Sequence, residues 1–428
     1  MLTVGLIFLL LLFFIFLGFP IFMATVITAI ICVVAMGIPS SLVIIKMFGS
    51  INSFALMAIP FFIIAGNIMT ESKITDKLVD FSNAIVGQFK GGLGHVNILA
   101  SMFFGGIQGS GAADASAIGG MLIPAMKKQG YEVEYAVALT AGASMLSPII
   151  PPSIAMILYS YYTEVPVGKL FISGILPGVV IGVLMMVVNS IYYRVRKYNI
   201  PVVKFSFRNL GKQFIKSIGA LITPLIILSG IVFGFVTPTE SGVLAILYGL
   251  FYGFFISREL KVSAIPRILL NSAVTTAVVL VTIAAAGVLG NVLVRLHFQT
   301  EVVNFAINVI QNRYLATFFI IAVMIVLGCF LDPTVLIAMF AISILNVGNA
   351  LGFDPIQYGL IMIIIMQVGA ITPPVGTFLF ISCGVGQIPL ERSVKPLMPF
   401  ILVILAVAIV MLFIPGIATW VPSLLGKF

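Results

Sequence analysis

Two interrupted apolar segments contain the residues of this chain that could bind an ion. The run Ser147-Pro-Ile-Ile-Pro-Pro-Ser153 holds three prolines, which remove amide donors and clash with preceding carbonyls, so it cannot continue a regular helix. The run Gly369-Ala-Ile-Thr-Pro-Pro-Val375 interrupts a second apolar segment in the same way. Broken helices free backbone carbonyls, and these hard oxygen ligands suit a sodium ion better than a soft metal. A pair of structural kinks is the alternative interpretation.

Two further apolar regions, 96–126 and 315–350, are each interrupted by glycine and an aspartate. Non-helical backbone at membrane depth is tolerated where it is buried in protein or lines a wet cavity, so both regions are predicted to be re-entrant hairpins. A charged side chain in such a hairpin is costly, which makes Asp114 and Asp332 candidate functional residues. Capping of a half-helix at the hairpin tip is the alternative role for each aspartate.

The glycine run of the first hairpin indicates a tight turn. It reads Gly105-Gly-Ile-Gln-Gly-Ser-Gly111, which is too rich in glycine for a packing helix. The run lacks the Gly-Lys-Ser/Thr ending of a phosphate loop, so it does not predict a nucleotide site. We expect its backbone amides and Ser110 to face a ligand.

Composition places these segments in a membrane. Of 428 residues, 61% are hydrophobic and 8% are charged, against about 45–50% and about 25% in ordinary soluble domains. A chain of this length allows on the order of ten crossings of about 20 residues each. The sequence therefore predicts an all-α polytopic membrane protein, whose N-terminal apolar stretch stays as a signal anchor.

The basic residues concentrate in one stretch, which comprises Arg194, Arg196, Lys197, Lys204, Arg208, Lys212 and Lys216. Cations so close to helix ends mark a cytoplasmic loop, and a bacterial inner membrane is the natural setting. Phenylalanines interleave with these cations, a pattern typical of a short amphipathic helix lying along the membrane surface.

The two halves of the chain contain an internal repeat. Pro151-Pro152 and Pro373-Pro374 lie 222 positions apart, and so do Gly130 and Gly352. Gly66-Asn67 and Gly290-Asn291 match at an offset of 224, and the change falls within the predicted hairpins. The offset of 222 also pairs the glycines Gly106 and Gly328. Paired halves with broken segments at matching places predict a secondary transporter with inverted repeats and a site at their interface.

The predicted organisation has three parts. A first repeat, 1–193, contains scaffold helices, the hairpin 96–126 and a broken helix over 135–160. A basic connector, 194–216, leads to the second repeat, 217–428, with the hairpin 315–350 and a broken helix over 357–382. The paired broken segments are the reason for dividing the chain in this way.

Other residues with chemical potential are assigned structural roles. His95 and His297 lie near span ends without partners at ligand spacing, and the three cysteines show no metal spacing, so no transition-metal site is predicted. An intramembrane hydrolase would need an activated nucleophile with its base, and Ser110 has neither histidine nor lysine placed nearby by the sequence. We therefore expect no enzyme. Thr237 and Glu240 flank Pro238 in the pattern of a helix capping box.

Five ordered motifs resemble those of the large membrane subunit of tripartite ATP-independent periplasmic (TRAP) transporters. They are Gly109-Ser-Gly-Ala-Ala-Asp114, Pro124-Ala-Met-Lys-Lys-Gln-Gly-Tyr131, Pro148-Ile-Ile-Pro-Pro-Ser153, Gly234-Phe-Val-Thr-Pro-Thr-Glu240 and Ile371-Thr-Pro-Pro-Val-Gly376. The resemblance spans roughly Gly18 to Phe380. It implies an elevator-type carrier with two hairpins in a moving domain, driven by an inward Na+ gradient.

The resemblance also implies partners and site residues. The partners are a small four-helix membrane subunit, expected here as a separate chain, and a periplasmic binding protein that delivers an organic acid such as a C4-dicarboxylate or sialic acid. Backbone carbonyls would hold two co-transported Na+ ions, one at Gly106, Ser147, Ile150 and Pro152, the other at Gly328, Gly369, Thr372 and Val375. The nearest candidates for substrate contact are Ser110, Asp114, Asp332 and Thr372. An uncoupled channel-like or assembly subunit is the alternative function.

Overall fold

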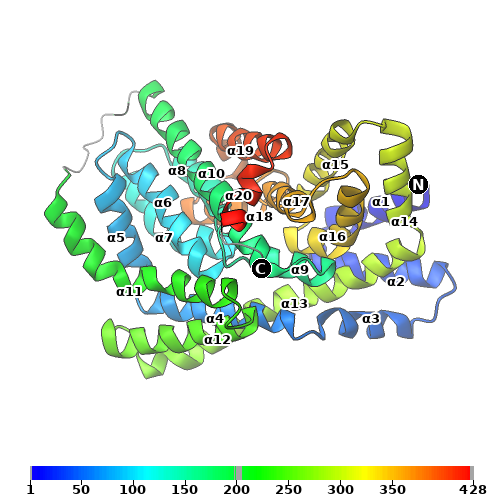
Figure 1. Ribbon diagram of the computed structural model, residues 1–428, viewed down its shortest axis with the longest axis horizontal. Helices are drawn as coiled ribbons and strands as arrows, with labels where there is room; N and C mark the ends of the chain where they lie inside the picture. Colours follow the sequence, from blue (N-terminus) through cyan, green and yellow to red (C-terminus); the bar gives the residue numbers. More distant parts are fainter. Residues whose placement is uncertain (1, 197, 199–204, 425–428) are drawn as a thin grey trace.

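The computed structural model describes residues 2–196, 198 and 205–424, and within these ranges it contains helices without strands (Figure 1). The helices of the first half are α1 (Leu2–Phe16), α2 (Ile21–Ala35), α3 (Ser41–Ile51), α4 (Ala58–Glu71), α5 (Ile74–Val86), α6 (Gly92–Gln108), α7 (Gly111–Lys128), α8 (Val133–Ser144), α9 (Ile154–Thr163) and α10 (Val167–Val195). Those of the second half are α11 (Phe207–Val232), α12 (Pro238–Phe251), α13 (Ile265–Arg295), α14 (Phe298–Asn304), α15 (Arg313–Gly328), α16 (Pro333–Ala350), α17 (Pro355–Gly369), α18 (Thr377–Gly386), α19 (Leu390–Phe413) and α20 (Gly416–Leu424). Short 3-10 or π segments occupy Ala55–Met57, Tyr252–Ile256, Val262–Ala264 and Phe305–Ile310.

Six helices of the described part are long and apolar enough to cross a membrane, namely α10, α11, α12, α13, α16 and α19 with their short extensions. The number rises to seven if α3 and α4, which meet at a bend of 65°, form one broken span. The all-α polytopic prediction is therefore confirmed. The shorter apolar helices include α15, which is one arm of the second hairpin, and α17 and α18, which are the two halves of a broken helix.

Corresponding helices of the two halves exchange packing partners. Helix α4 packs against α12, and its counterpart α13 packs against α2. The second arm of each hairpin packs against a half-helix of the other repeat, α7 against α18 and α16 against α9. Helix α8 packs against α19, while α17 packs against α10. In Figure 1 the first hairpin lies left of centre and the second lies right of it. Reciprocal exchange of this kind is the packing of two repeats related by a two-fold axis.

The connector differs from the prediction of a separate surface helix. Helix α11 begins at Phe207 and runs unbroken to Val232, so the aromatic and basic residues form the first turns of a membrane helix. The Ser206 side chain caps its start by accepting a hydrogen bond from the Asn209 N–H at 3.3 Å. The helix continues through Pro224, so the connector residues from Phe207 onward and the apolar residues that follow form one element. Lys197 and Lys204 of the predicted basic stretch lie outside the described residues.

The predicted capping box at the start of α12 is confirmed. The Thr237 N–H donates to the Glu240 carboxylate at 2.7 Å, and the Glu240 N–H donates to the Thr237 hydroxyl at 3.3 Å. Pro238 occupies the first helical position, where a missing N–H costs nothing. This geometry gives Glu240 a structural role.

We expect Glu240→Ala to lower the free energy of unfolding by about 1 kcal/mol, the usual loss for a helix cap, and to leave transport unchanged. The thermal unfolding midpoint of the detergent-purified protein measures the loss. Glu259→Ala removes an exposed carboxylate outside any cap and serves as the matched control. Equal midpoints for the two variants would contradict the assignment.

Candidate ion and substrate site

The tip of the first hairpin lies directly against the first helix break. A Cβ atom at Gly105 would lie 2.7 Å from the Cα of Ser147, closer than real Cβ atoms approach, so the backbone contact requires glycine. One residue further, Gly106 faces Pro224, and a Cβ atom at Gly106 would lie 3.8 Å from the Pro151 carbonyl oxygen. The Gly109 carbonyl accepts a hydrogen bond from the Ile154 N–H at 3.4 Å. We call this contact the first junction.

The second hairpin meets the second break in the same way. A Cβ atom at Gly328 would lie 2.9 Å from the Cα of Gly369, and one at Gly369 would overlap the Gly328 backbone. The Cys329 carbonyl accepts a hydrogen bond from the Val375 N–H at 3.1 Å. We call this contact the second junction. Since Ser147 and Gly369 are repeat mates, Gly105 is the spatial counterpart of Gly328, and the sequence pairing of Gly106 with Gly328 is one residue out of register.

Backbone carbonyls at both junctions are left without hydrogen bonds. Among the hydrogen bonds of the described residues, none is accepted by the backbone carbonyls of Gly106, Ser147, Ile150, Pro152, Gly328, Thr372 or Val375. The eighth predicted ligand, Gly369, already accepts from the Thr372 N–H at 3.0 Å. Gly106, Ser147, Pro152 and Gly328 are buried, whereas Ile150, Thr372 and Val375 are half-buried. Buried carbonyls normally have partners, so the free ones at each junction fit a hard cation that ligates oxygen.

Two buried hydroxyls add oxygen atoms to the junctions. The hydroxyls of Ser147 and Thr377 have no hydrogen-bond partner among the described residues, whereas the Thr372 hydroxyl donates to the Val368 carbonyl at 2.7 Å. Sequence reasoning missed Thr377. Its place directly after Gly376, at the end of the Pro373-Pro374 break, was the sequence signal that could have identified it.

The two predicted aspartates occupy different environments. Asp332 is the N-cap of α16 and accepts a hydrogen bond from the Thr334 N–H at 2.9 Å. Its repeat mate, 222 positions earlier, is Ser110, which caps α7 by accepting from the Ala113 N–H at 3.4 Å. Asp114 and Asp332 are therefore not counterparts in the repeat, because the hairpin tips pair Ser110 with Asp332.

Asp114 lies one turn into α7 and is fully buried. Neither carboxylate oxygen has a hydrogen bond of ordinary geometry to a described residue, although Ser101 of α6 lies beside the carboxyl group. Its own N–H donates to the Ser110 carbonyl at 3.0 Å, which fixes it next to the first hairpin tip. A buried carboxyl group without partners is costly, and such groups mark functional positions in membrane proteins.

The structure distributes the four substrate candidates over both junctions. Ser110 and Asp114 belong to the first hairpin, whereas Asp332 and Thr372 border the second junction. Phe378 of α18 links the two regions, because a Cβ atom at Gly111 would overlap its ring. The first hairpin tip thus touches the half-helix that follows the second break, and the Phe378 N–H donates to the Ala370 carbonyl of that break at 2.8 Å.

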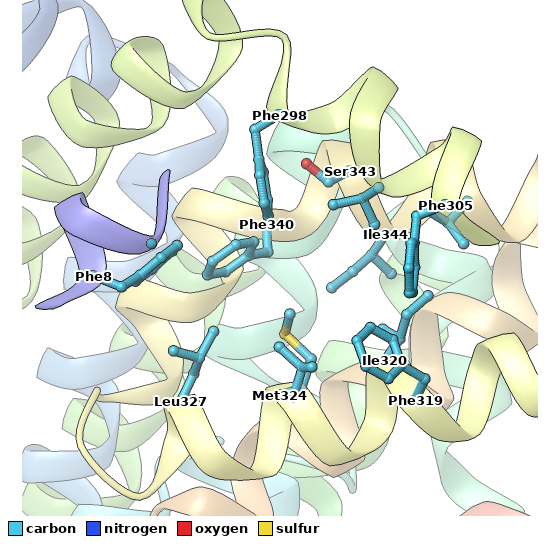
Figure 2. A pocket seen from close by; sticks show the side chains of 14 residues that line it. Phe8, Phe298, Phe305, Phe319, Ile320, Met324, Leu327, Phe340, Ser343 and Ile344 are labelled. Atoms are coloured by element: carbon cyan, nitrogen blue, oxygen red, sulfur yellow. The ribbon is translucent and has the colours of Figure 1, made fainter. Parts of the chain in front are cut away.

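A large cavity beside the second hairpin does not belong to this site. Its volume is about 510 Å³, and Figure 2 shows its walls to be phenylalanine, methionine and aliphatic side chains from α1, α14, α15, α16 and the π segment that begins at Phe305. Ser343 is the one polar side chain among the labelled residues. Such a lining suits hydrocarbon and offers little to an ion or an organic acid.

These observations define a class of protein: a polytopic helical transporter built from two inverted repeats, each with a hairpin docked on a broken helix. The YdaH transporter of Alcanivorax borkumensis shares this fold with a TM-score of 0.56 at 12% identity, over 89% of each chain.

The chain belongs to the DctM family, because the family model described as "Tripartite ATP-independent periplasmic transporter, DctM component" matches residues 4–417. It is 34% identical to the C4-dicarboxylate TRAP transporter large permease protein DctM of Pseudomonas aeruginosa, covering 89% of each chain. It is 32% identical to the sialic acid TRAP transporter large permease protein SiaM of Vibrio cholerae, covering 85% of this chain and 86% of that one. Both relatives are named as permeases, in agreement with the expectation that this protein is a transporter and not an enzyme.

Proposed function

We propose that this protein carries a small organic acid into the cell by sodium-coupled, elevator-type transport across a bacterial inner membrane. The two junctions are the observation that supports coupling most directly, because each one gathers free carbonyl oxygens from a hairpin tip and a helix break. The relatives named for C4-dicarboxylates and sialic acid support an organic acid as the substrate class. On this proposal the chain consists of two repeats, residues 1–193 and 217–428, and a connector between them, residues 194–216.

Sodium binding at a junction would determine whether the hairpin is docked on its helix break. A cation held between Gly106 and the carbonyls of the first break would offset the repulsion among those oxygens, so the hairpin would dock firmly only with the ion present. The second junction repeats the arrangement with Gly328 and the second break. Reciprocal packing of α7 on α18 and α16 on α9 would make the docked hairpins move as one body relative to the scaffold helices.

Two partners complete the proposed system. The family description is that of a tripartite periplasmic transporter, which supports a small four-helix membrane subunit and a soluble periplasmic binding protein. The organic acid would reach this chain from the binding protein, and the membrane subunit would enlarge the fixed scaffold.

An uncoupled channel-like or assembly subunit is the second candidate function. Free carbonyls at two matched junctions favour the coupled carrier, because a passive pore has no use for two sites that a hairpin closes.

Uptake of labelled succinate and N-acetylneuraminate into proteoliposomes tests the proposal. We expect accumulation only when the small subunit, the binding protein and an inward Na+ gradient are all present. Replacing the Na+ gradient by an equal K+ gradient serves as the control. If the labelled acid only equilibrates across the membrane, at a rate that does not depend on Na+, the uncoupled alternative is favoured and ion binding at the junctions is rejected.

A further inference from the structure

A cavity of about 380 Å³, lined by both polar and apolar residues, lies between α3, α9, α13, α14 and α16 and shares no lining residue with either junction. We call it the outer vestibule, and its polar lining consists of Lys46, Ser50, Tyr161, Tyr162, Asn291 and Gln299. These side chains come from four separate helices that the sequence does not place together. Such convergence of polar groups in a membrane protein is costly unless it serves a ligand or water.

The vestibule opens on the side opposite the basic connector. Helix α10 starts at Val167, just after Tyr161 and Tyr162, and its last turn carries Arg194. Its 29 residues span about 43 Å, enough to cross the whole bilayer. The basic end is cytoplasmic by the positive-inside rule, so the vestibule lies on the periplasmic side.

The vestibule lining is rich in hydrogen-bond donors and, among the described residues, contains no aspartate or glutamate. Lys46 contributes an ammonium group, and the buried Tyr162 hydroxyl has no hydrogen-bond partner in the part of the chain that the structure describes. The Asn291 side-chain oxygen accepts from Arg295 at 3.2 Å, which leaves its amide N–H groups available. A lysine ammonium with neutral donors around it, and the Arg295 guanidinium bonded to Asn291, match a carboxylate.

The vestibule walls belong to two groups of helices. Lys46 and Asn291 lie on α3 and α13, which pack against each other outside the hairpins. Ala338 and Met339 of the second hairpin form part of the opposite wall, and a Cβ atom at Gly290 would lie 3.6 Å from the Ala338 carbonyl oxygen. A ligand here would therefore contact a scaffold helix and a hairpin arm together.

We propose that the outer vestibule binds a carboxylate group of the incoming organic acid on the periplasmic side, with Lys46 as its charged anchor. The inference rests on the proposed function for the direction of transport. It adds a first substrate-binding site outside the hairpin tips. Because hairpin movement would change one wall and leave the other in place, transport would alter the shape of this binding site.

Direct binding to the full-length purified chain tests the proposal. Titration calorimetry with succinate is expected to show at least a tenfold rise in Kd for Lys46→Gln, the loss typical of a charge-assisted hydrogen bond. Lys46→Arg keeps the charge and is expected to retain affinity within a few-fold. Lys169→Gln removes a half-buried lysine from the periplasmic end of α10, outside the vestibule, and should bind like the wild type.

Each outcome decides the proposal. Wild-type affinity in Lys46→Gln, an absence of succinate binding to the wild type, or equally tight binding of succinamide would overturn it. Equal binding of inorganic phosphate would reduce the vestibule to a general anion site and reject the carboxylate assignment. Uptake into proteoliposomes separates this inference from the proposed function. If Lys46→Gln keeps its sodium-driven uptake, only the carboxylate site in the vestibule is rejected. If succinate binding depends on Lys46 but uptake does not depend on sodium, only the sodium coupling is rejected.

Discussion

Leucine at Gly369 is expected to reduce sodium-driven uptake at least about 100-fold, which corresponds to about 2.7 kcal/mol. Even a Cβ atom at this position would overlap the Gly328 backbone, and a leucine side chain would force the second hairpin away from its break. The carbonyls of Gly328 and Thr372 would then no longer face a common ion. The protein should still insert, because the change adds an apolar side chain to an apolar helix.

Gly384→Leu is the matched control for this substitution. Gly384 lies on α18, in the same half of the molecule, and a Cβ atom there meets nothing within 4 Å. Uptake measured against Na+ concentration in proteoliposomes should therefore resemble the wild type for Gly384→Leu and lose its sodium activation for Gly369→Leu. Sodium activation that survives in Gly369→Leu would remove the second junction from the mechanism.

The repeat and its breaks could be predicted because they depend on local chemistry. Two consecutive prolines remove two amide donors and crowd the preceding turn, so Pro151-Pro152 and Pro373-Pro374 locate both breaks from the sequence alone. The capping box at Thr237 and Glu240 is local in the same sense, because both partners lie within one turn. The apolar composition identifies lipid as the surrounding solvent, and the structure confirms the all-α architecture.

Register and long-range packing were not predictable from the sequence. Sequence alignment of the halves pairs Gly106 with Gly328, but close backbone contact selects Gly105, a difference of one residue that only packing decides. Asp114 and Asp332 look alike in sequence, yet one is buried without a cap partner and the other caps a helix. The outer vestibule depends on α3 packing against α13, more than 200 residues away, which no local pattern reports.

Asp114→Asn is expected to raise the Na+ concentration for half-maximal uptake about tenfold while preserving or raising the thermal unfolding midpoint. The carboxyl group lies in the first turn of α7, next to the hairpin tip that contributes Gly106 to the first junction. In a low-dielectric interior a nearby negative charge stabilises a cation, and the N-terminus of α7 favours that negative charge in turn. This role removes a difficulty of assigning Asp114 to substrate contact, since an aspartate beside an anionic substrate would repel it, whereas one beside a sodium ion attracts it.

The stability measurement distinguishes this role from a purely structural one. Burying an amide costs less than burying an unpaired carboxylate, so the asparagine variant should fold at least as well as the wild type. Asp76→Asn makes the same change at a half-exposed position on α5, where the ion pair with Lys73 contributes little, and it should alter neither quantity. An unchanged sodium requirement in Asp114→Asn would show that the carboxyl group does not act on the ion. A lowered unfolding midpoint together with weak uptake would instead make Asp114 a structural residue of the first hairpin.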